Sequence, residues 1–450
     1  MAQTVTIKMY KDSNYYFVNS AEADQGAVGA GLSVKDIVDA VGTTKNATIV
    51  FGHSGAGNTT TYSFGTSETI TTNINVIMEA GARLAIATGV TLTINGPFQA
   101  NKRLQCIALT GTGVVSFGEE SVSEVYPEWW GGVADGSTVV TTQINNALTA
   151  ITRGVVKLAP GVYDTGGTVI YILGTGKHLV GSGIDATFLE GDADSNVHIS
   201  MGNASTTAQG CSVRDLTMFR AAGTLDSDGH GIYATNFLHC FVQNIKVRRE
   251  YNAFVIISET GFSNASFGFK VLGCFIEEVP GIAFYVGAAS DTVSNVVIDG
   301  NTIGNAGKGG GNTLTANYFL YTDGTPDSVA FINNIAMYAA DTAEIGNRTS
   351  FTNLVVKNNI GISSDIFATK TYDAPEIAAA SYAATSWNDI TGAALGDIAI
   401  AALEVDVANL VVDARVIAAD TVEITLYNNT VGAINLASTT VNVRVIKAEV

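Results

Sequence analysis

The middle of this 450-residue chain repeats a short pattern, in which an apolar strand ends at a polar residue that is followed by another apolar one. Successive copies lie 23 to 34 residues apart. Three strands of about five residues with their connecting loops need roughly that length. The repeat therefore predicts a solenoid in which each coil supplies three short strands. The polar residues taken as equivalent are Asp215, Asn244, Glu278, Asn301, Asn334 and Asn359.

Asn and Asp tolerate left-handed backbone and can hydrogen-bond along a stack of turns. We therefore interpret these polar residues as turn or ladder residues rather than as catalytic ones. Cys211, Cys240 and Cys274 stand at similar places in similar segments and lack the spacing of a zinc site. Stacked, buried free thiols are the better interpretation of these cysteines.

The composition favours a mostly β protein. The chain has 48 Gly but only 6 Pro, and 46% hydrophobic residues against 14% charged ones, which fits many short strands joined by tight turns. The net charge of −18 disfavours nucleic acid and anionic membranes as partners. It would also repel a polyanionic glycan unless a local basic patch or bound Ca²⁺ intervened.

The start of the chain shows no signal peptide, and no stretch approaches the length of a membrane span. We therefore expect synthesis in a cytoplasm and no insertion into a membrane. Release from the cell by lysis fits this expectation as well as residence does.

Changes in pattern divide the chain into four predicted regions. Residues 1–45 show nothing catalytic, and residues 46–124 carry apolar pulses separated by Gly and Asn, which predict a β region that is itself solenoidal. Residues 125–368 hold the repeats. Residues 369–450 alternate cleanly, as in half-buried antiparallel sheets, and predict a small β-sandwich.

A short amphipathic helix is predicted near the start of the repeats. Thr141 and Thr142 are suited to cap it, and its apolar residues recur at helical spacing. Such a helix would cover open backbone and core side chains of a first coil. The apolar residues are Ile144, Ala147, Leu148 and Ile151.

The run Tyr126–Gly136, with Glu128-Trp129-Trp130-Gly131 inside it, and the later segment Gly154–Tyr163 resemble the opening of a pectate-lyase-like right-handed parallel β-helix. Proteins of this kind include phage tailspikes and tail fibres. Many relatives carry acidic residues directly after the equivalent of Asp135-Gly136, whereas this chain continues with Ser137–Val140. We interpret Trp129 and Trp130 as packing anchors.

The resemblance implies a homotrimer, aided by the C-terminal module, that is attached through residues 1–45 to a virion or tail baseplate and binds bacterial surface polysaccharide. It implies a location on the virion tail or a released extracellular particle. The leading hypothesis is a tailspike-like receptor-binding protein. One alternative is an active polysaccharide depolymerase, either a hydrolase or a lyase, on the same scaffold. Another is a structural fibre without enzymatic activity.

Glycan hydrolysis needs two carboxyl groups that flank the bond, and neighbouring coils about 4.8 Å apart can supply them. The densest acidic cluster gives the predicted catalytic residues Asp226, Asp228 and Glu250. Gly229-His230-Gly231 echoes a motif of polygalacturonase-like hydrolases, although a turn with a surface His is the plainer interpretation. The predicted substrate-binding residues are His230, Lys246, Arg248, Tyr233 and Tyr251.

These predictions have open alternatives. Lys246, Arg248 and the adjacent Arg249 could bind a carboxylate or sulfate, or could belong to a solvated outer face. No metal site and no cofactor are predicted, with Ca²⁺ as the one ion that a lyase mechanism would need. Further acidic pairs and looser aromatic candidates for a glycan groove are Glu277 with Glu278, Asp192 with Asp194, and Tyr285 and Tyr318.

Overall fold

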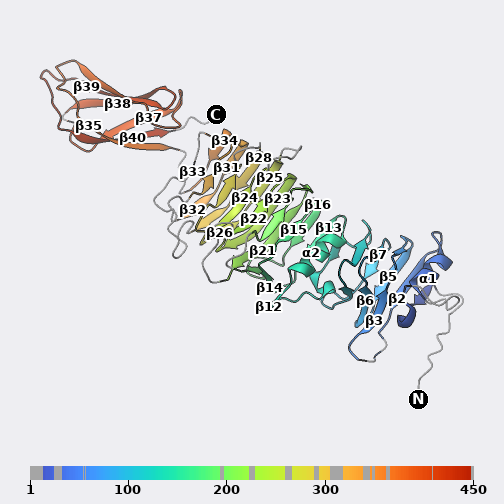
Figure 1. Ribbon diagram of the computed structural model, residues 1–450. Helices are drawn as coiled ribbons and strands as arrows, with labels where there is room; N and C mark the ends of the chain where they lie inside the picture. Colours follow the sequence, from blue (N-terminus) through green and yellow to red (C-terminus); the bar gives the residue numbers. More distant parts are fainter. Residues whose placement is uncertain are drawn as a thin grey trace.

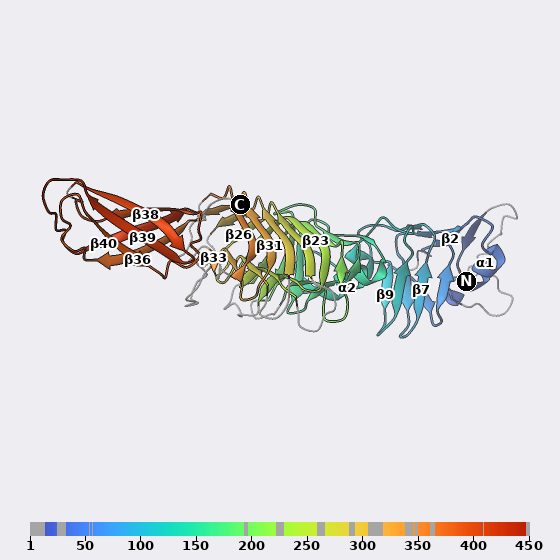
Figure 2. The ribbon, with the colours of Figure 1, turned by 90° about the horizontal axis from the view of Figure 1, so that it is seen from above.

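The computed structural model is an elongated, mostly β molecule with a parallel solenoid at its N-terminal side and a separate β module at its C-terminal end (Figures 1 and 2). This confirms the predicted fold, a parallel β-helix followed by a β-sandwich. None of the helices described has the length and apolar character to cross a bilayer. The structure describes residues 14–24, 33–53, 55, 57–192, 197–221, 229–258, 266–287, 293–304, 318–337, 345–346, 350–360, 365–407 and 409–446.

The N-terminal coils form three parallel sheets. Helix α1 (Val34–Val41) begins at Ser33, whose hydroxyl accepts from the backbone N–H of Asp36 (3.1 Å), and it buries Val34, Ile37 and Val41 against the solenoid core. The strands are β1 (Tyr15–Phe17), β2 (Ala47–Phe51), β5 (Ile74–Met78) and β8 (Phe98–Gln99) in one sheet, β3 (Thr60–Phe64), β6 (Ala82–Ile86) and β9 (Ile107–Leu109) in the second, and β4 (Glu68–Ile70), β7 (Thr91–Ile94) and β10 (Val114–Phe117) in the third.

The Trp pair is buried where the N-terminal coils meet the central ones. Trp129, in the short helix η2 (Pro127–Trp130), packs on Phe98 and Phe117 with ring centroids 5.2 and 6.0 Å away. Glu128 is also buried, and it accepts a hydrogen bond from the hydroxyl of Tyr163 (2.6 Å). The interpretation of Trp129 and Trp130 as packing anchors is confirmed.

Helix α2 (Thr141–Ala150) lies beside this junction and buries Ile144, Ala147 and Leu148. Its N-cap is Val140, without a side-chain cap, so the expected capping role of the threonines is wrong. The Thr141 hydroxyl instead donates to the backbone oxygen of Thr165 (2.6 Å). A single hydrophobic core continues past the helix on both sides, so α2 covers a flank of the solenoid between two sets of coils.

The central coils build two large parallel sheets. One has 17 strands and turns two corners within each coil, because long strands such as β23 (Phe237–Arg248) bend without breaking. Its other strands are β11 (Glu124–Val125), β12 (Asp135–Val139), β13 (Gly154–Lys157), β14 (Gly161–Gly166), β16 (Gly174–Thr175), β17 (Lys177–Val180), β18 (Thr187–Gly191), β20 (Ala208–Gln209), β21 (Ser212–Arg220), β25 (Ser266–Leu272), β26 (Phe275–Glu277), β28 (Val293–Asp299), β29 (Thr302–Gly304), β31 (Asp327–Ile332), β32 (Ile335–Met337) and β34 (Thr352–Lys357).

The second sheet has seven short strands and closes each coil. Its strands are β15 (Ile170–Ile172), β19 (Ile199–Met201), β22 (His230–Ala234), β24 (Asn252–Ile256), β27 (Phe284–Val286), β30 (Leu320–Tyr321) and β33 (Ile345–Gly346).

One corner is formed by residues with left-handed backbone, as the recurrence of Asn and Asp predicted. Asp215 and Asn244 have φ of 60° and 51°, and the strand register on both sides places them in one row. The predicted alignment is wrong in joining this pair to the later residues, because Cys274 aligns with Ile245 and Glu278 lies outside the row. Asn301, Asn334 and Asn359 are equivalent to one another, as predicted, but they belong to the neighbouring row. The corner row is Asp215, Asn244, Gly273, Gly300, Asn333 and Asn358, with φ between 51° and 67°.

Asn301, Asn334 and Asn359 occupy the next position and form a hydrogen-bonded ladder. Asn301 and Asn334 are fully buried. Asn334 Oδ1 accepts from the backbone N–H and from Nδ2 of Asn301 (3.0 and 2.9 Å), and Asn359 Oδ1 does the same for Asn334 (2.8 and 3.1 Å). Asn301 Oδ1 accepts from the N–H of Cys274 (2.8 Å). Each amide thus satisfies backbone groups of the preceding coil in the interior.

The prediction of free, buried thiols is confirmed, since Cys106, Cys211, Cys240 and Cys274 are all free and buried. Cys211 and Cys240 stack on consecutive coils, because their neighbours Ser212 and Phe241 are paired. Cys274 belongs to a different row.

The C-terminal module consists of two three-stranded antiparallel sheets with apolar side chains between them. Trp387 and Ile424 from one sheet meet Val443 from the other in this core. The strands are β35 (Ile366–Tyr372), β40 (Thr439–Ile446) and β37 (Ile398–Leu403) in one sheet, and β36 (Tyr382–Trp387), β39 (Thr421–Asn428) and β38 (Leu410–Ala418) in the other.

We predict that Asn334→Ala destabilises the solenoid by roughly 3 kcal/mol, because it leaves buried donors of Asn301 without an acceptor. Asn333→Gly is the matched control. It removes an exposed corner Asn at a left-handed position that Gly adopts readily, and should change stability by less than about 0.5 kcal/mol. Denaturant unfolding followed by circular dichroism measures both, and equal losses would contradict the ladder's role.

Candidate functional site

The outer surface of the seven-stranded sheet carries a row of tyrosines. The strand register runs from Tyr171 through Ser200, Tyr233, Val255 and Tyr285 to Tyr321. The flanking side chains of these strands are buried in the core, so alternation directs the tyrosine row outward. We call Tyr171, Tyr233, Tyr285, Tyr318 and Tyr321 the tyrosine face.

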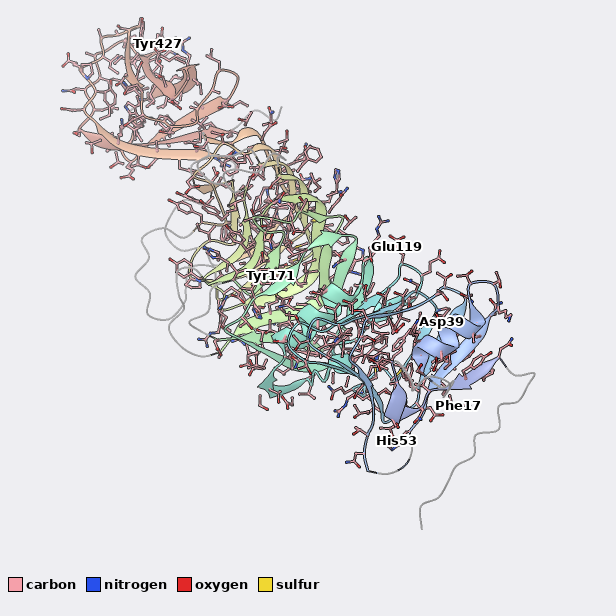
Figure 3. The ribbon with its side chains drawn as sticks, turned by 45° about the vertical axis from the view of Figure 1, so that its right-hand side comes forward. Phe17, Asp39, His53, Glu119, Tyr171 and Tyr427 are labelled. Atoms are coloured by element: carbon pink, nitrogen blue, oxygen red, sulfur yellow. The ribbon has the colours of Figure 1, made fainter. Side chains whose placement is uncertain are left out.

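Members of this face stack on one another. The rings of Tyr285 and Tyr321 have centroids 5.7 Å apart, and those of Tyr318 and Tyr321 are 4.9 Å apart. The hydroxyl of Tyr285 donates to Asp323, and burial together with this carboxylate raises the pKa of Tyr285. The ring of Tyr171 is 44% exposed at the other end of the row (Figure 3). Tyrosine rings in such a setting offer an apolar surface with a polar rim.

His230 and Tyr233, both predicted as substrate-binding residues, lie together on this sheet. Their rings are stacked with centroids 5.9 Å apart and an interplanar angle of 6°. Asn252 Nδ2 lies 3.3 Å from His230 Nδ1. Tyr251 precedes β24 and is half-buried, and its backbone N–H donates to Gly229 O (2.7 Å).

A shallow hollow of about 440 Å³ adjoins Tyr171 at the end of the row next to α2. Leu148 of the helix, Lys177 of β17 and Ser205 of the segment after β19 contribute to its lining. The ammonium of Lys177 donates to the backbone oxygen of Leu148 (2.7 Å), and burial lowers the pKa of this lysine.

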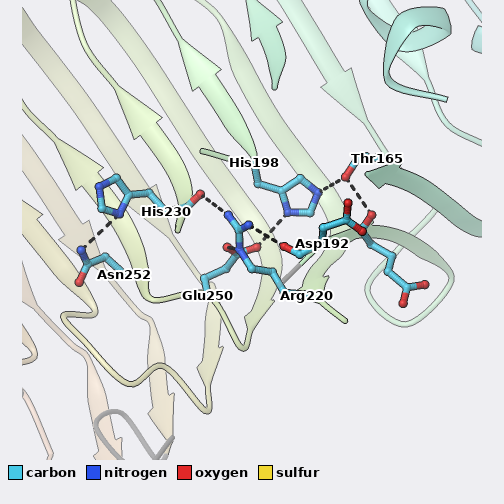
Figure 4. A network of polar contacts seen from close by, with 8 residues as sticks. Thr165, Asp192, His198, Arg220, His230, Glu250 and Asn252 are labelled. Carbon is cyan, nitrogen blue, oxygen red and sulfur yellow. Dashed lines mark hydrogen bonds and ion pairs between the residues drawn. The ribbon is translucent and has the colours of Figure 1, made fainter. Parts of the chain in front are cut away.

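Glu250, a predicted catalytic residue, lies inside the molecule rather than on its surface. Its carboxylate is ion-paired with Arg220 and lies 2.9 Å from His198 Nδ1, and none of these three side chains is more than 1% exposed (Figure 4). Arg220 also donates to the backbone oxygens of Asp192 (3.0 Å) and His230 (3.3 Å). In this arrangement Glu250 cannot touch a polysaccharide, because the network encloses it.

The other predicted catalytic residues, Asp226 and Asp228, lie outside the described residues, as does Asp194. Their placement relative to Glu250 and to the tyrosine face therefore stays a prediction.

The predicted basic residues face acidic partners. Lys246 Nζ lies 3.4 Å from Glu277 and 3.7 Å from Asp185. Arg248 makes a two-pronged contact with Glu278 (3.0 and 2.9 Å), which raises the pKa of the arginine and lowers that of the carboxyl. This pairing favours the alternative interpretation, a solvated outer face, over a carboxylate-binding patch.

The residue-level predictions missed several members of the site. Tyr171 and Tyr321 each stand beside apolar residues in a short strand, so alternation could have identified both as outward-facing. Asp164 and Glu190 are paired in register on consecutive coils, which no sequence pattern revealed. Burial, Asp164 and Asp192 together raise the pKa of Glu190.

No protein-family model and no curated protein matches the chain. Among solved structures, a variant tailspike protein of the E. coli bacteriophage HK620 with a bound pentasaccharide is 12% identical, with a TM-score of 0.42 and coverage of 96% of this chain and 94% of that one. The Dettilon tailspike protein is 10% identical, with a TM-score of 0.33 and the same coverages. ORF18 of Geobacillus virus E2 is 13% identical, with a TM-score of 0.37 and coverages of 71% and 76%. Similarity this distant identifies no activity for the chain.

We predict that Arg220→Met destabilises the protein by about 3–5 kcal/mol, because Glu250 would keep a buried charge without its partner. The double variant Arg220→Met/Glu250→Leu removes both charges and should recover most of that loss. Thermal and denaturant unfolding measure the two effects. A double variant as unstable as the single one would contradict a simple ion-pair role.

Proposed function

We propose that this chain is a phage or prophage tailspike-like receptor-binding protein that recognises bacterial surface polysaccharide. The single observation that carries the proposal is the tyrosine face, because it sets aromatic rings in a row along the axis of a rigid solenoid. Tyr171, Tyr233 and Tyr285 recur on every second coil, about 9.6 Å apart, and Tyr321 lies on the coil after Tyr285, so the row offers repeated contacts to an extended chain. Stacked rings that are already ordered lose little entropy when they bind.

The remaining parts of the proposal concern assembly. A homotrimer would need subunit contacts, and the C-terminal module exposes large apolar side chains suited to such contacts, among them Phe367 (65% exposed), Ile398 (61%) and Ile400 (52%). Register places all three on the outer face of the sheet β35–β40–β37. We further propose attachment to the virion or baseplate through residues 1–45 and a location on the virion tail or a released particle.

Replacing Tyr285 with Ala should weaken polysaccharide binding about tenfold, because one stacked ring contributes roughly 1.5 kcal/mol. The measurement is surface plasmon resonance on lipopolysaccharide and capsule preparations from a panel of bacteria. Tyr233→Ala/Tyr285→Ala should reduce binding further.

Tyr382→Ala is the matched control for this series. Tyr382 is 66% exposed in β36 of the C-terminal module, which is separate from the solenoid that carries the tyrosine face (Figure 1). Its loss should leave binding unchanged. Wild-type binding that survives the double tyrosine variant would place the receptor site elsewhere and refute this assignment.

The depolymerase alternative is favoured by Asp164 and Glu190. Register places the two residues side by side on coils about 4.8 Å apart, a spacing from which their carboxyl groups can reach the 5–5.5 Å separation of a retaining glycosidase. The raised pKa of Glu190 suits a general acid, which must hold its proton until the leaving group takes it. A lyase would instead need several oxygen ligands around Ca²⁺.

If the protein cleaves a polysaccharide that it binds, Glu190→Gln should abolish the release of new reducing ends while binding persists. Glu277→Gln, on the same row of the outer surface, is the control and should keep full activity. Unsaturated sugar products would indicate a lyase. Binding without any cleavage by the wild type would exclude this alternative for the glycan tested.

A further inference from the structure

The hollow beside Tyr171 holds a cation whose setting differs from that of the other basic residues discussed above. Lys177 begins β17 and points its ammonium toward the C-terminal turn of α2, where the backbone oxygen of Leu148 accepts one of its hydrogens (2.7 Å). Carbonyl oxygens at the end of a helix lack partners within the helix and carry partial negative charge. The contact therefore fixes the position of the ammonium and leaves two N–H groups for another acceptor.

No carboxylate in the described part of the chain lies within 4.0 Å of Lys177 Nζ. Lys246 and Arg248, by contrast, both face carboxylates. The lysine is also half-buried, and burial lowers its pKa. The Cys211 thiol partly offsets this effect of burial on the pKa. An anion that entered the hollow would therefore meet a half-buried ammonium that has no carboxylate partner among the described residues.

The walls of the hollow suit a sugar ring. Tyr171 supplies an aromatic surface, and its backbone is held in place because its N–H donates to Asn145 Oδ1 (2.9 Å). Asn145 is held in turn by a bond from its Nδ2 to the backbone oxygen of Val169 (2.9 Å). The hollow's volume, about 440 Å³, lies within the usual range of small-molecule sites.

We propose that this hollow binds a sugar unit carrying one negative charge, with Lys177 holding the anionic group and Tyr171 stacking on the ring. The inference rests on the proposed function, and it names the class of glycan: a repeating unit with an acidic sugar. Of the residues that the structure describes, Lys177 is the one cation that lines the hollow, so the site can neutralise one negative charge on the sugar. The net charge of −18 would disfavour a polymer charged at every unit.

The test uses small probes, so that it does not depend on knowing the host glycan. Saturation-transfer NMR compares methyl β-glucuronide, glucose 6-sulfate and methyl β-glucoside with the full-length protein. A charge-assisted hydrogen bond should favour the charged probes about tenfold over the neutral one. Preference for the glucuronide over the sulfate would identify a carboxylate site, and the reverse a sulfate site.

Lys177→Gln should remove the preference for the charged probes, and Lys177→Arg should retain it. Lys157→Gln is the matched control, because Lys157 also donates to a backbone oxygen, that of Gly181 (2.5 Å), but does not line the hollow. Tyr171→Ala should weaken all three probes. Circular dichroism and the melting temperature check that each variant is folded.

Equal affinity of the wild type for charged and neutral probes would overturn the inference. So would a preference that survives in Lys177→Gln. Neither result would affect the proposed receptor function, which depends on Tyr233 and Tyr285 and on intact polysaccharide. Loss of polysaccharide binding in Lys177→Gln, with the glucuronide preference also lost, would link the hollow to the tyrosine face.

Discussion

The left-handed corner is the constraint on which the solenoid depends. From Asp215 on, each coil changes direction at the same position, so that its strands pair with those of the coil before, and a residue with positive φ makes that change without ending the strand. Asn, Asp and Gly fill the row from Asp215 to Asn358 because they adopt this backbone at little cost. Once these corners are in register, the side chains of paired strands lie above their equivalents in the preceding coil. Aliphatic and aromatic residues then stack in a continuous core from Val18 to Phe351.

Stacking also explains how polar groups are tolerated inside. Asn301 and Asn334 are buried on neighbouring coils, and the side-chain oxygen of each accepts a backbone N–H from the preceding coil. The oxygen of Asn334 also accepts from the side-chain amide of Asn301. The buried charges of Glu250 and Arg220 are likewise paired with each other. His198 also contacts Glu250, and two backbone oxygens accept hydrogen bonds from Arg220. An unpaired member of either group would cost several kcal/mol, so these networks help to fix one register rather than a range of registers.

The shared register of the coils also aligns side chains on the outer surface, and this alignment forms the candidate site. Tyrosines from strands distant in the sequence fall into one row because their strands share a register, and Tyr171 brings that row to the hollow beside α2. The helix therefore has two roles. Its apolar face covers the core, while its C-terminal carbonyl oxygens orient Lys177. Paired charges around Lys246 and Arg248 leave that part of the surface less suited to an anion than the hollow.

The sequence by itself determined the fold class, the buried thiols, the packing of Trp129 and Trp130, and the sandwich, because each depends on local periodicity or on side-chain size. The sequence also identified Tyr233 and His230 as candidate binding residues, but it did not identify which acidic residues could be catalytic. Tertiary structure decided that Glu250 is interior, that Cys274 and Glu278 belong to other rows than supposed, and that Asp164 faces Glu190. Loops of unequal length separate the coils, so the position of a residue along the chain does not show which residues of the neighbouring coils lie beside it. Only the register of the paired strands shows this.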